Sequence, residues 1–538
     1  MADDTNPTDM NPTDTTNTTS AGTTTASATG VVGTVDPDDI TRYSTDFAAD
    51  RANRVAANAA VSSGVLAAAT SYRGVRDLPR DFNVQLKQGS ITNQRRSGRC
   101  WMFASLNTLR YEVMHRWNLD DFEFSENYLF FWDKIEKANV YLENVLATLD
   151  EPTDSRTFEV INEGPVDDGG WWQMFVNLAD KYGLVPKSAY PESANSMDSD
   201  AFVQYLNTVL RGFAARLREA HAKGANLAQL RQMKDDDMAV VYRMTAIALG
   251  EPPTHFEFTA RTKDDADDGE ASEGSEKNGS EKKAADSAAD TANANDSAAD
   301  TADANASTTA ENPAPKDGTE NYDGTDRSGI IHEESITPLE FLHKYVPVRP
   351  DDFVTLCNAP MKRTPFGKRY AIKWSTNVAG TEQMTFVNVP MDTLRDAAVR
   401  QLKAGHPLWF ACDCMQFALR DKGIFDPATV RVDELFGIEL PYEKGEAIEY
   451  GDAPSNHAMT LTGVNLNTDG KPNRWKIENS WGKTAGEDGY FVASNEWFDR
   501  YVTELVVRTD LLDDATRAIL STPVVEVEPW EPLTRPCE

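Results

Sequence analysis

The chain is poor in cysteine, in basic side chains and in long apolar runs, and each deficit excludes a class of protein. Five Cys among 538 residues, an odd number without a C-x-x-C pair, argue against a disulfide framework and a structural zinc site. No apolar run approaches the ~18 residues of a membrane-spanning helix. The 53 Lys and Arg against 86 Asp and Glu disfavour nucleic-acid binding through a broad basic face. Sparse thiols and the lack of a signal-like N-terminus predict a cytoplasmic protein without membrane attachment.

Two acidic, low-complexity segments carry more than half of the formal net charge of −33. Residues 1–41 contain seven Asp and no Lys or Arg, and residues 261–327 contain 18 acidic and seven basic side chains. Such segments bury too little apolar surface to offset the entropy of ordering them. We therefore predict a disordered acidic tail over 1–41 and a disordered acidic insert, serving as a solvated spacer, over 258–328.

The rest of the sequence is helical first and rich in strands later. Apolar residues at helical spacing predict helices over about 45–66, 100–117, 171–183 and 198–249. Runs of β-branched and aromatic residues predict strands in RYAIKW, MTFVNVP, HPLWFACDC, HAMTLTGVNL, RWKIENSWG, GYFVASNEWF and YVTELVVRT. This order predicts an α+β fold with two lobes. Its parts are a helical lobe over 42–257, a β-rich lobe over 329–522 and a C-terminal arm over 523–538.

Cys100 stands at the start of the predicted 100–117 helix. A thiol at a helix N-terminus lies at the positive end of the helix dipole, which favours the thiolate and suits a nucleophile. A lone Cys is more often a small buried hydrophobe, so this interpretation needs partner residues.

Four further residues supply that context. Gln94, on the loop before the helix, could direct an N–H at an oxyanion beside the sulfur, together with the Cys100 backbone N–H. His457 opens the strand-like run NHAMTLTGV, and Asn479 in KIENSWG could orient its imidazole, with Trp481 shielding that bond from water. Each has an ordinary structural reading alone. Together, in the order Gln, Cys, His, Asn, they predict a cysteine nucleophile with an imidazole base.

These motifs resemble the papain-like cysteine peptidases, and specifically the bleomycin hydrolase and bacterial aminopeptidase C family. The likeness rests on QRRSGRCWMFASLNTLR, FEFSENYLFFWDK, DDGGWWQM, YGLVPKSAYPE, NHAMTLTGV and KIENSWG. It spans roughly residues 75–255 and 332–510. Arg99 departs from the C-G-[SA]-C-[WY] pattern of most papain relatives but fits this branch.

The resemblance implies a papain-like two-lobe fold with helical insertions, and an enzyme without a metal or cofactor. The implied roles are Cys100 as nucleophile, His457 as general base and then acid, Asn479 as its orienter, and Gln94 as oxyanion donor. Gly169 and Gly170 are implied to line the cleft, where the substrate backbone approaches closely. The family also implies a homohexamer with its sites facing an inner chamber.

A C-terminal arm lying in the active-site cleft is a further feature of this family. Trp530-Glu531-Pro532-Leu533 is similar to the arm's Trp-Asp-Pro-Met, but the last five residues depart from the family's small, apolar ending. The carboxylates of Glu538 would attract the substrate's ammonium group, whereas Arg535 would repel it if it pointed into the cleft.

The predicted function is an intracellular cysteine aminopeptidase that releases N-terminal residues from peptides through a thioester acyl-enzyme. An endopeptidase of the same family would share every catalytic residue and differ only in how the cleft is blocked. A non-catalytic peptide- or nucleic-acid-binding relative is a further alternative, disfavoured by the complete set of four catalytic side chains.

Two other groups of residues have weaker interpretations. Cys412 and Cys414 would share one strand face, but with only His406 nearby they give little support to a metal site. The arginines of the loop before Cys100 could favour a thiolate or a substrate carboxylate, or could form a solvated loop; they are Arg95, Arg96 and Arg99.

Overall fold

The computed structural model describes residues 33–263, 329–440, 443–452, 454–533 and 535–537. The chain divides into two compact units, residues 1–68 and residues 69–538. The first unit contains α1 (Pro37–Ala49), α2 (Arg51–Ser63) and most of α3 (Val65–Ala69). Helix α1 begins inside the segment expected to be a disordered tail, because the Asp36 side chain caps its first turn. Residues 1–32 of that predicted tail lie outside the described residues.

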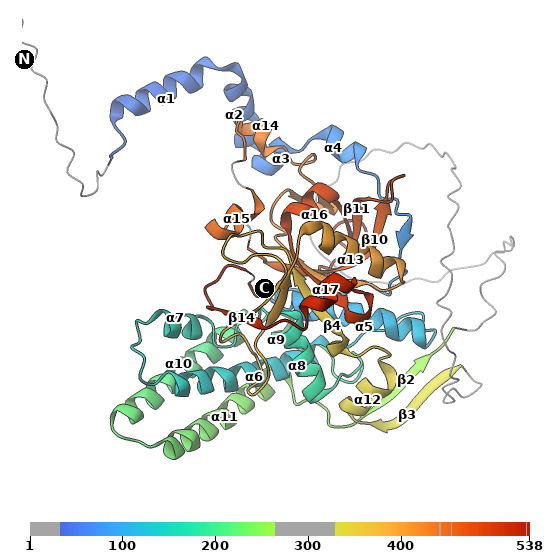
Figure 1. Ribbon diagram of the computed structural model, residues 1–538. Coiled ribbons are helices and arrows are strands. Elements are labelled where there is room, and N and C mark those ends of the chain that lie inside the picture. The colour runs from blue at the N-terminus through green and yellow to red at the C-terminus, as the bar shows by residue number, and fades with distance from the viewer. Residues whose placement is uncertain (1–32, 264–328, 441–442, 453, 534, 538) are drawn as a thin grey trace, which may run out of the picture. The chain divides into compact units, whose positions relative to one another are not determined.

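The second unit joins a helical lobe to a large sheet (Figure 1). Its longer helices are α5 (Cys100–Arg116), α6 (Glu126–Ala147), α8 (Trp172–Tyr182), α10 (Asp200–Ala222), α11 (Leu227–Leu249) and α13 (Met391–Lys403). Its shorter helices are α4 (Tyr72–Asp77), α7 (Arg156–Glu163), α9 (Ala194–Met197), α12 (Pro338–Tyr345), α14 (Val432–Phe436), α15 (Lys444–Tyr450), α16 (Asn495–Tyr501) and α17 (Asp514–Ile519), with 3-10 turns η1 (Pro350–Asp352), η2 (Arg420–Lys422) and η3 (Thr509–Leu511). Helices α6, α10 and α11 pack on one another and form most of the helical lobe.

Twelve strands form the main sheet, in the order β14-β5-β6-β4-β13-β7-β10-β11-β12-β9-β8, with β1 paired to β10. They are β1 (Val84–Gln85), β4 (Phe353–Cys357), β5 (Lys368–Ile372), β6 (Thr385–Asn388), β7 (Leu408–Cys412), β8 (Ala418–Leu419), β9 (Ile424–Phe425), β10 (His457–Leu466), β11 (Pro472–Glu478), β12 (Tyr490–Ser494), β13 (Val502–Arg508) and β14 (Val524–Val527). The predicted α+β fold is confirmed.

The two faces of the sheet bury different cores. In β7, Trp409 and Ala411 belong to the core shared with the helical lobe, whereas Leu408 and Phe410 belong to the core under α13 and α16. This follows from the two-residue period of a strand, whose side chains alternate between faces. Helix α5 packs on β7 and β10 and is buried from Cys100 to Val113, so it lies between the lobes. Its buried charged side chain Arg110 is paired with Glu478, the last residue of β11, so the helix is tied to the sheet by an ion pair as well as by apolar packing.

The hairpin of β10 and β11 brings two predicted site residues together. His457 is the first residue of β10 and Asn479 directly follows the end of β11. Because the strands are antiparallel, the start of one lies beside the end of the other. The segment before α5 runs along the same place, since the Gln94 N–H donates to the Ser480 carbonyl (2.8 Å).

A separate two-stranded sheet flanks the acidic insert. Strand β2 (Phe256–Arg261) pairs with β3 (Ile330–Ile336), and Arg261 lies opposite Ile330. The predicted insert boundary at residue 258 therefore falls inside a strand. Residues 264–328 of the predicted insert lie outside the described residues.

One predicted strand is partly wrong. Of the run 489–498, only β12 is extended, and its second half is the start of α16. The Ser494 side chain accepts a hydrogen bond from the Trp497 N–H and so caps a new helix. The aromatic residues of this stretch favoured a strand in the sequence, but the cap decides the local structure.

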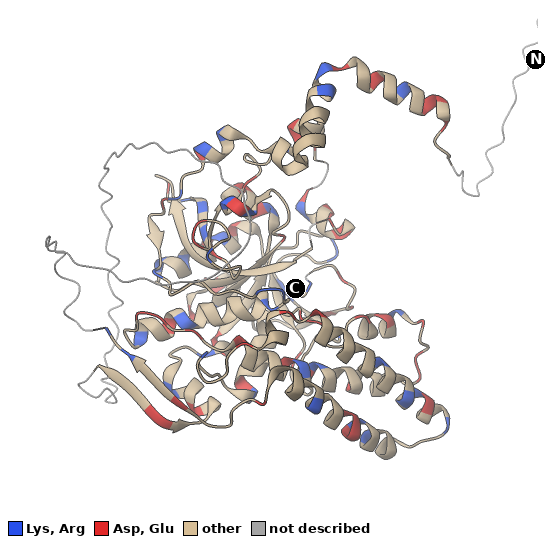
Figure 2. Ribbon diagram, turned by 180° about the vertical axis from the view of Figure 1, so that it is seen from behind, with Lys and Arg blue, Asp and Glu red and all other residues tan. Residues whose placement is uncertain are grey.

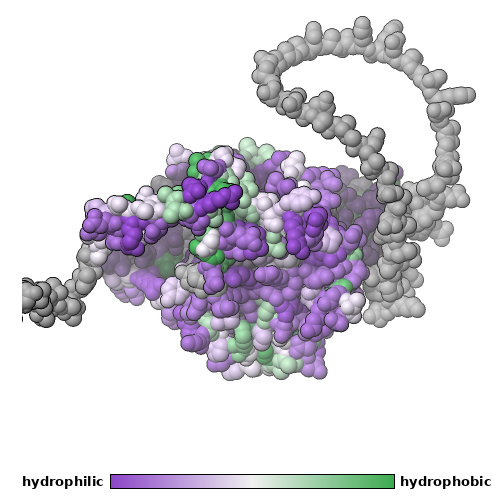
Figure 3. Space-filling view, turned by 90° about the horizontal axis from the view of Figure 1, so that it is seen from above, coloured by the Kyte–Doolittle hydropathy of each residue, from purple (hydrophilic) through white to green (hydrophobic). Residues whose placement is uncertain are grey.

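Charged residues of both signs are spread over the described helices. Figure 2 shows Lys and Arg interspersed with Asp and Glu over the helices, and the face in Figure 3 is mostly hydrophilic with small apolar patches. Of the helices that the structure describes, none has the length and apolar character needed to cross a membrane.

Candidate active site

Cys100 is the first residue of α5 and is fully buried between the lobes. Its sulfur accepts a hydrogen bond from the Ala458 backbone N–H at 3.4 Å. Ala458 directly follows His457, so the thiol and the imidazole meet across the boundary between the helical lobe and the sheet. The N-terminus of α5 and the start of β10 thus bring together residues far apart in sequence.

The imidazole of His457 is oriented by Asn479. The His457 Nε2 atom lies 2.9 Å from Asn479 Oδ1, and the same oxygen accepts the Ser480 backbone N–H at 2.8 Å. Because a backbone N–H only donates, the second contact identifies the amide oxygen, and His457 Nε2 is then the donor. The proton on Nε2 leaves Nδ1 as the acceptor of the neutral ring.

Trp481 covers this pair. Its ring stacks on the His457 ring with centroids 4.8 Å apart. Burial is the main cause that lowers the pKa of His457 to about 4. The hydrogen bond to Asn479 raises the pKa, and the charge of Arg420 makes a smaller contribution to lowering it. The imidazole is therefore neutral near pH 7 and able to accept a proton.

Gln94 lies beside these groups with its side chain held at both ends. Its Oε1 accepts from Ser480 Oγ at 2.6 Å, and its Nε2 donates to the Ser97 carbonyl at 2.7 Å. One of the two Nε2 hydrogens is therefore used. The other is available as a donor, as an oxyanion site requires.

Arg99, directly before Cys100, is buried rather than solvated, which corrects the solvated-loop interpretation for this residue. Its guanidinium forms a two-point ion pair with Glu192 (3.2 and 2.9 Å) and lies 5.1 Å from the ring centres of Phe103 and Phe130. This pair anchors the start of α5. The neighbouring Arg95 and Arg96 are exposed.

A buried network that the sequence did not reveal holds the 166–170 loop against α5. Asp168 accepts from Lys134 Nζ (2.8 Å) and from the Gly98 backbone N–H (3.0 Å), while Lys137 Nζ donates to the Gly169 carbonyl (2.7 Å). Burial alone would raise the pKa of Asp168, but Lys134 lowers it to about 2. The loop with the paired glycines and the turn before Cys100 are therefore fixed to the same charged groups. Spaced charges on a helix give no sign that they are buried.

Gly170 requires a glycine because of its contact with Trp101. A Cβ atom at this position would lie 2.5 Å from the Trp101 ring. The Trp101 Nε1–H in turn donates to the Asp168 carbonyl at 2.7 Å. The indole next to Cys100 thus fixes how closely the 166–170 loop approaches α5. Because Gly170 has no side chain, its backbone N–H and carbonyl can pair with another extended segment.

The C-terminal arm occupies this backbone edge. The Gly170 N–H donates to the Cys537 carbonyl at 3.0 Å, and the Cys537 N–H donates to the Gly170 carbonyl at 3.1 Å. Upstream, the Arg156 guanidinium lies 4.4 Å from the Trp530 ring centre, and Arg363 pairs with Glu531 at 2.7 Å. Cys537 and Leu533 are buried. The arm therefore crosses from the sheet to the helical lobe, where Cys537 pairs with Gly170; Glu538 lies outside the described residues.

Of the other thiols, Cys357, Cys412 and Cys414 are core residues, and Cys537 is the buried thiol of the C-terminal arm. Burial raises the pKa of Cys357, Cys412 and Cys537, and that of Cys414 to about 12. Within the described ranges no group of three or more metal-ligating side chains converges.

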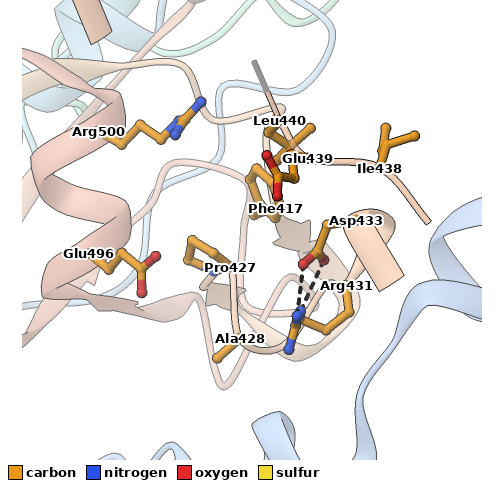
Figure 4. A pocket seen from close by; sticks show the side chains of 10 residues that line it. All are labelled: Phe417, Pro427, Ala428, Arg431, Asp433, Ile438, Glu439, Leu440, Glu496 and Arg500. Atoms are coloured by element: carbon orange, nitrogen blue, oxygen red, sulfur yellow. Dashed lines mark hydrogen bonds and ion pairs between the residues drawn. The ribbon is translucent and has the colours of Figure 1, made fainter. Parts of the chain in front are cut away.

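A surface cavity of about 420 Å³ lies between the β9–α14 connection, the segment after α14, and α16 (Figure 4). Its lining residues are Phe417, Pro427, Ala428, Arg431, Asp433, Ile438, Glu439, Leu440, Glu496 and Arg500. None of the predicted site residues is among them, so the cavity is separate from the site.

A thiol at a helix start, opposite an imidazole and an amide on neighbouring strands, is the arrangement of papain-like cysteine peptidases. The sequence matches the family model described as the Peptidase C1-like family over residues 34–272 and 305–534. The chain therefore belongs to the Peptidase C1-like family. The resemblance found in the sequence is confirmed.

Named relatives cover nearly the whole chain. The chain is 35% identical over 488 residues to aminopeptidase C of Streptococcus thermophilus, covering 91% of this chain and 96% of the relative. It is 34% identical over 502 residues to aminopeptidase C of Lactococcus lactis subsp. cremoris, covering 93% and 99%. The crystal structure of PepW from Lactobacillus rhamnosis is 34% identical, with a TM-score of 0.79 and coverage of 93% of this chain and 99% of that one.

Proposed function

We propose that the chain hydrolyses the first peptide bond of peptides, with Cys100 as nucleophile, His457 as general base and acid, and Asn479 as the orienting amide. The chain is a cysteine-type aminopeptidase, in agreement with relatives that are named aminopeptidases over nearly its whole length.

One observation carries this proposal: the backbone pair between Cys537 and Gly170 beside the Cys100, His457 and Asn479 side chains. A peptide that extended along the Gly170 edge would need the hydrogen bonds that the arm already makes. Only a short N-terminal portion of a substrate then fits between the arm and Cys100. Glu538 follows Cys537 directly, and we propose that its carboxylate binds the substrate's ammonium group.

In the proposed mechanism, His457 Nδ1 accepts the Cys100 proton and the thiolate attacks the carbonyl of the first residue. Gln94 Nε2 and the Cys100 N–H stabilise the tetrahedral oxyanion. The imidazolium gives its proton to the leaving amine, and a thioester remains on Cys100. Water, activated by the same imidazole, then hydrolyses the thioester. These steps need only groups of this chain and water.

Alkylation tests the proposed nucleophile. The four other thiols are buried with raised pKa values, so they form little thiolate. Brief treatment with iodoacetamide followed by peptide mapping should find Cys100 modified first, with activity lost in parallel. Full activity after stoichiometric modification of Cys100 would exclude it as the nucleophile.

The low pKa of His457 predicts the acidic limit of activity. The base must be neutral, and burial moves its protonation from the usual ~6.5 to about 4. As the pH falls, kcat/KM should therefore stay nearly constant through pH 5.5 and decline only near pH 4. A decline centred near pH 6.5, measured with an uncharged leaving group, would show that the imidazole is not buried as described.

The endopeptidase alternative is not favoured, because the arm fills the Gly170 edge and the named relatives are aminopeptidases. We also propose a cytoplasmic location, where a catalytic thiol remains reduced. A homohexamer remains a proposal that rests on the family resemblance, and sedimentation analysis would test it.

A further inference from the structure

Arg420 lies next to the candidate site and forms no ion pair with an acidic side chain in the part of the chain that the structure describes. It opens the η2 turn and is exposed. Its guanidinium carbon lies 5.1 Å from the centre of the Trp481 ring, which stacks on His457. The charge is close enough to lower the pKa of His457. A cation thus lies one aromatic ring away from the proposed general base.

The lack of a carboxylate partner distinguishes this arginine from its neighbours. Arg80 pairs with Glu487, and Arg431 pairs with Asp433 at 2.7 Å. Among the described residues no Asp or Glu forms an ion pair with Arg420, whose side chain instead contacts the Met415 sulfur. The guanidinium is free to bind an anion from solution.

The next step rests on the proposed function. The arm closes the cleft on the side of Gly170, which receives the first residue of the substrate. His457 protonates the leaving amine, so the rest of the peptide departs on the side of His457 and of the Trp481 ring that covers it. An aminopeptidase holds nearly its whole substrate on this leaving side. Side chains of the protein that lie beside Trp481 therefore contact the second and later residues of the substrate.

We propose that Arg420 binds a carboxylate in the leaving part of the substrate. The enzyme would then favour short peptides whose C-terminal carboxylate reaches Arg420. The ring contacts of 4.8 and 5.1 Å place the guanidinium no farther from His457 than the length of about three extended residues, at ~3.4 Å each. A planar guanidinium beside an aromatic ring suits a carboxylate, which it can bind through two N–H groups. The carboxylate is the C-terminus of a di- or tripeptide, or an acidic side chain in a longer one.

The test compares matched substrates on the full-length enzyme. Alanine di-, tri- and tetrapeptides are assayed as free acids and as C-terminal amides, and a tetrapeptide amide is assayed with Glu or Gln at its second or third position. We expect kcat/KM to favour the free acid about fivefold for di- or tripeptides, mainly through KM, and the preference to vanish by the tetrapeptide. A preference for Glu over Gln in the tetrapeptide amide would show that an acidic side chain can also supply the carboxylate that Arg420 binds.

Arg420→Gln should lower the acid-to-amide ratio to one or below, because only the negative field of the protein then acts on the substrate. Arg420→Lys should restore part of the ratio through its charge. Lys422→Gln is the matched control, since Lys422 is an exposed cation on the same turn. Equal ratios for acid and amide in the wild-type enzyme, or an equal effect of Lys422→Gln, would overturn the proposal. Failure of the aminopeptidase assignment would be distinct, because no free-amine substrate would then be cleaved.

Discussion

Replacing Cys100 with alanine is expected to reduce kcat by at least about 10⁴-fold, to the level of background hydrolysis. The sulfur forms the covalent bond of the acyl-enzyme, and no other described thiol is placed to replace it. Cys412, Cys414 and Cys537 are buried thiols with raised pKa values and belong to the packed cores. The oxyanion donors and the arm would remain, so substrate binding should persist.

The matched control is Cys357→Ala, which removes another fully buried thiol from β4. It should lose some stability but keep its turnover per folded molecule. Circular dichroism and thermal unfolding of both variants separate loss of chemistry from loss of folding. Substantial turnover by folded Cys100→Ala would mean that a different group attacks the substrate.

Removing residues 535–538 is expected to change which substrates are cleaved. The truncation deletes both hydrogen bonds between Cys537 and Gly170 and the carboxylates of Glu538. Hydrolysis of free-amine peptides should fall by about 10- to 100-fold, because the substrate's ammonium group loses its charged partner. Cleavage of N-acetylated peptides should appear, because the Gly170 edge becomes open to an extended backbone.

A point variant separates the two effects of the arm. Glu538→Gln keeps the Cys537 pair and removes the side-chain carboxylate, so it should weaken free-amine binding without admitting blocked peptides. The upstream contacts of Trp530 and Glu531 remain in both variants and should preserve the fold. Unchanged activity on free and blocked peptides after the truncation would show that the arm does not select substrates.

The sequence predicted those parts of the molecule in which local pattern and chemistry agree. The alternating run beginning at His457 forms β10 over its predicted length, and Cys100 opens α5 as expected. His457, Asn479, Trp481 and Gln94 lie together. Their placement follows from motifs at element ends, which a hairpin and a helix start bring to one point.

The remaining features depend on contacts between distant residues. Nothing in the pattern of α6 shows that Lys134 and Lys137 are buried and hold the glycine loop, because spaced charges usually mark a solvated face. The sequence does not distinguish Arg99 from the two other arginines of its loop, because its burial depends on the ion pair with the distant Glu192. The pairing of β2 with β3 across the insert also requires the folded chain, since 68 residues separate Arg261 from Ile330.

The most direct test of an arm-gated cysteine aminopeptidase compares one peptide with a free and with an acetylated N-terminus, under reducing conditions. We expect rapid release of the first residue from the free peptide, no cleavage of the acetylated one, and complete loss of activity after iodoacetamide. Equal cleavage of both peptides, or activity that survives modification of Cys100, would contradict this expectation.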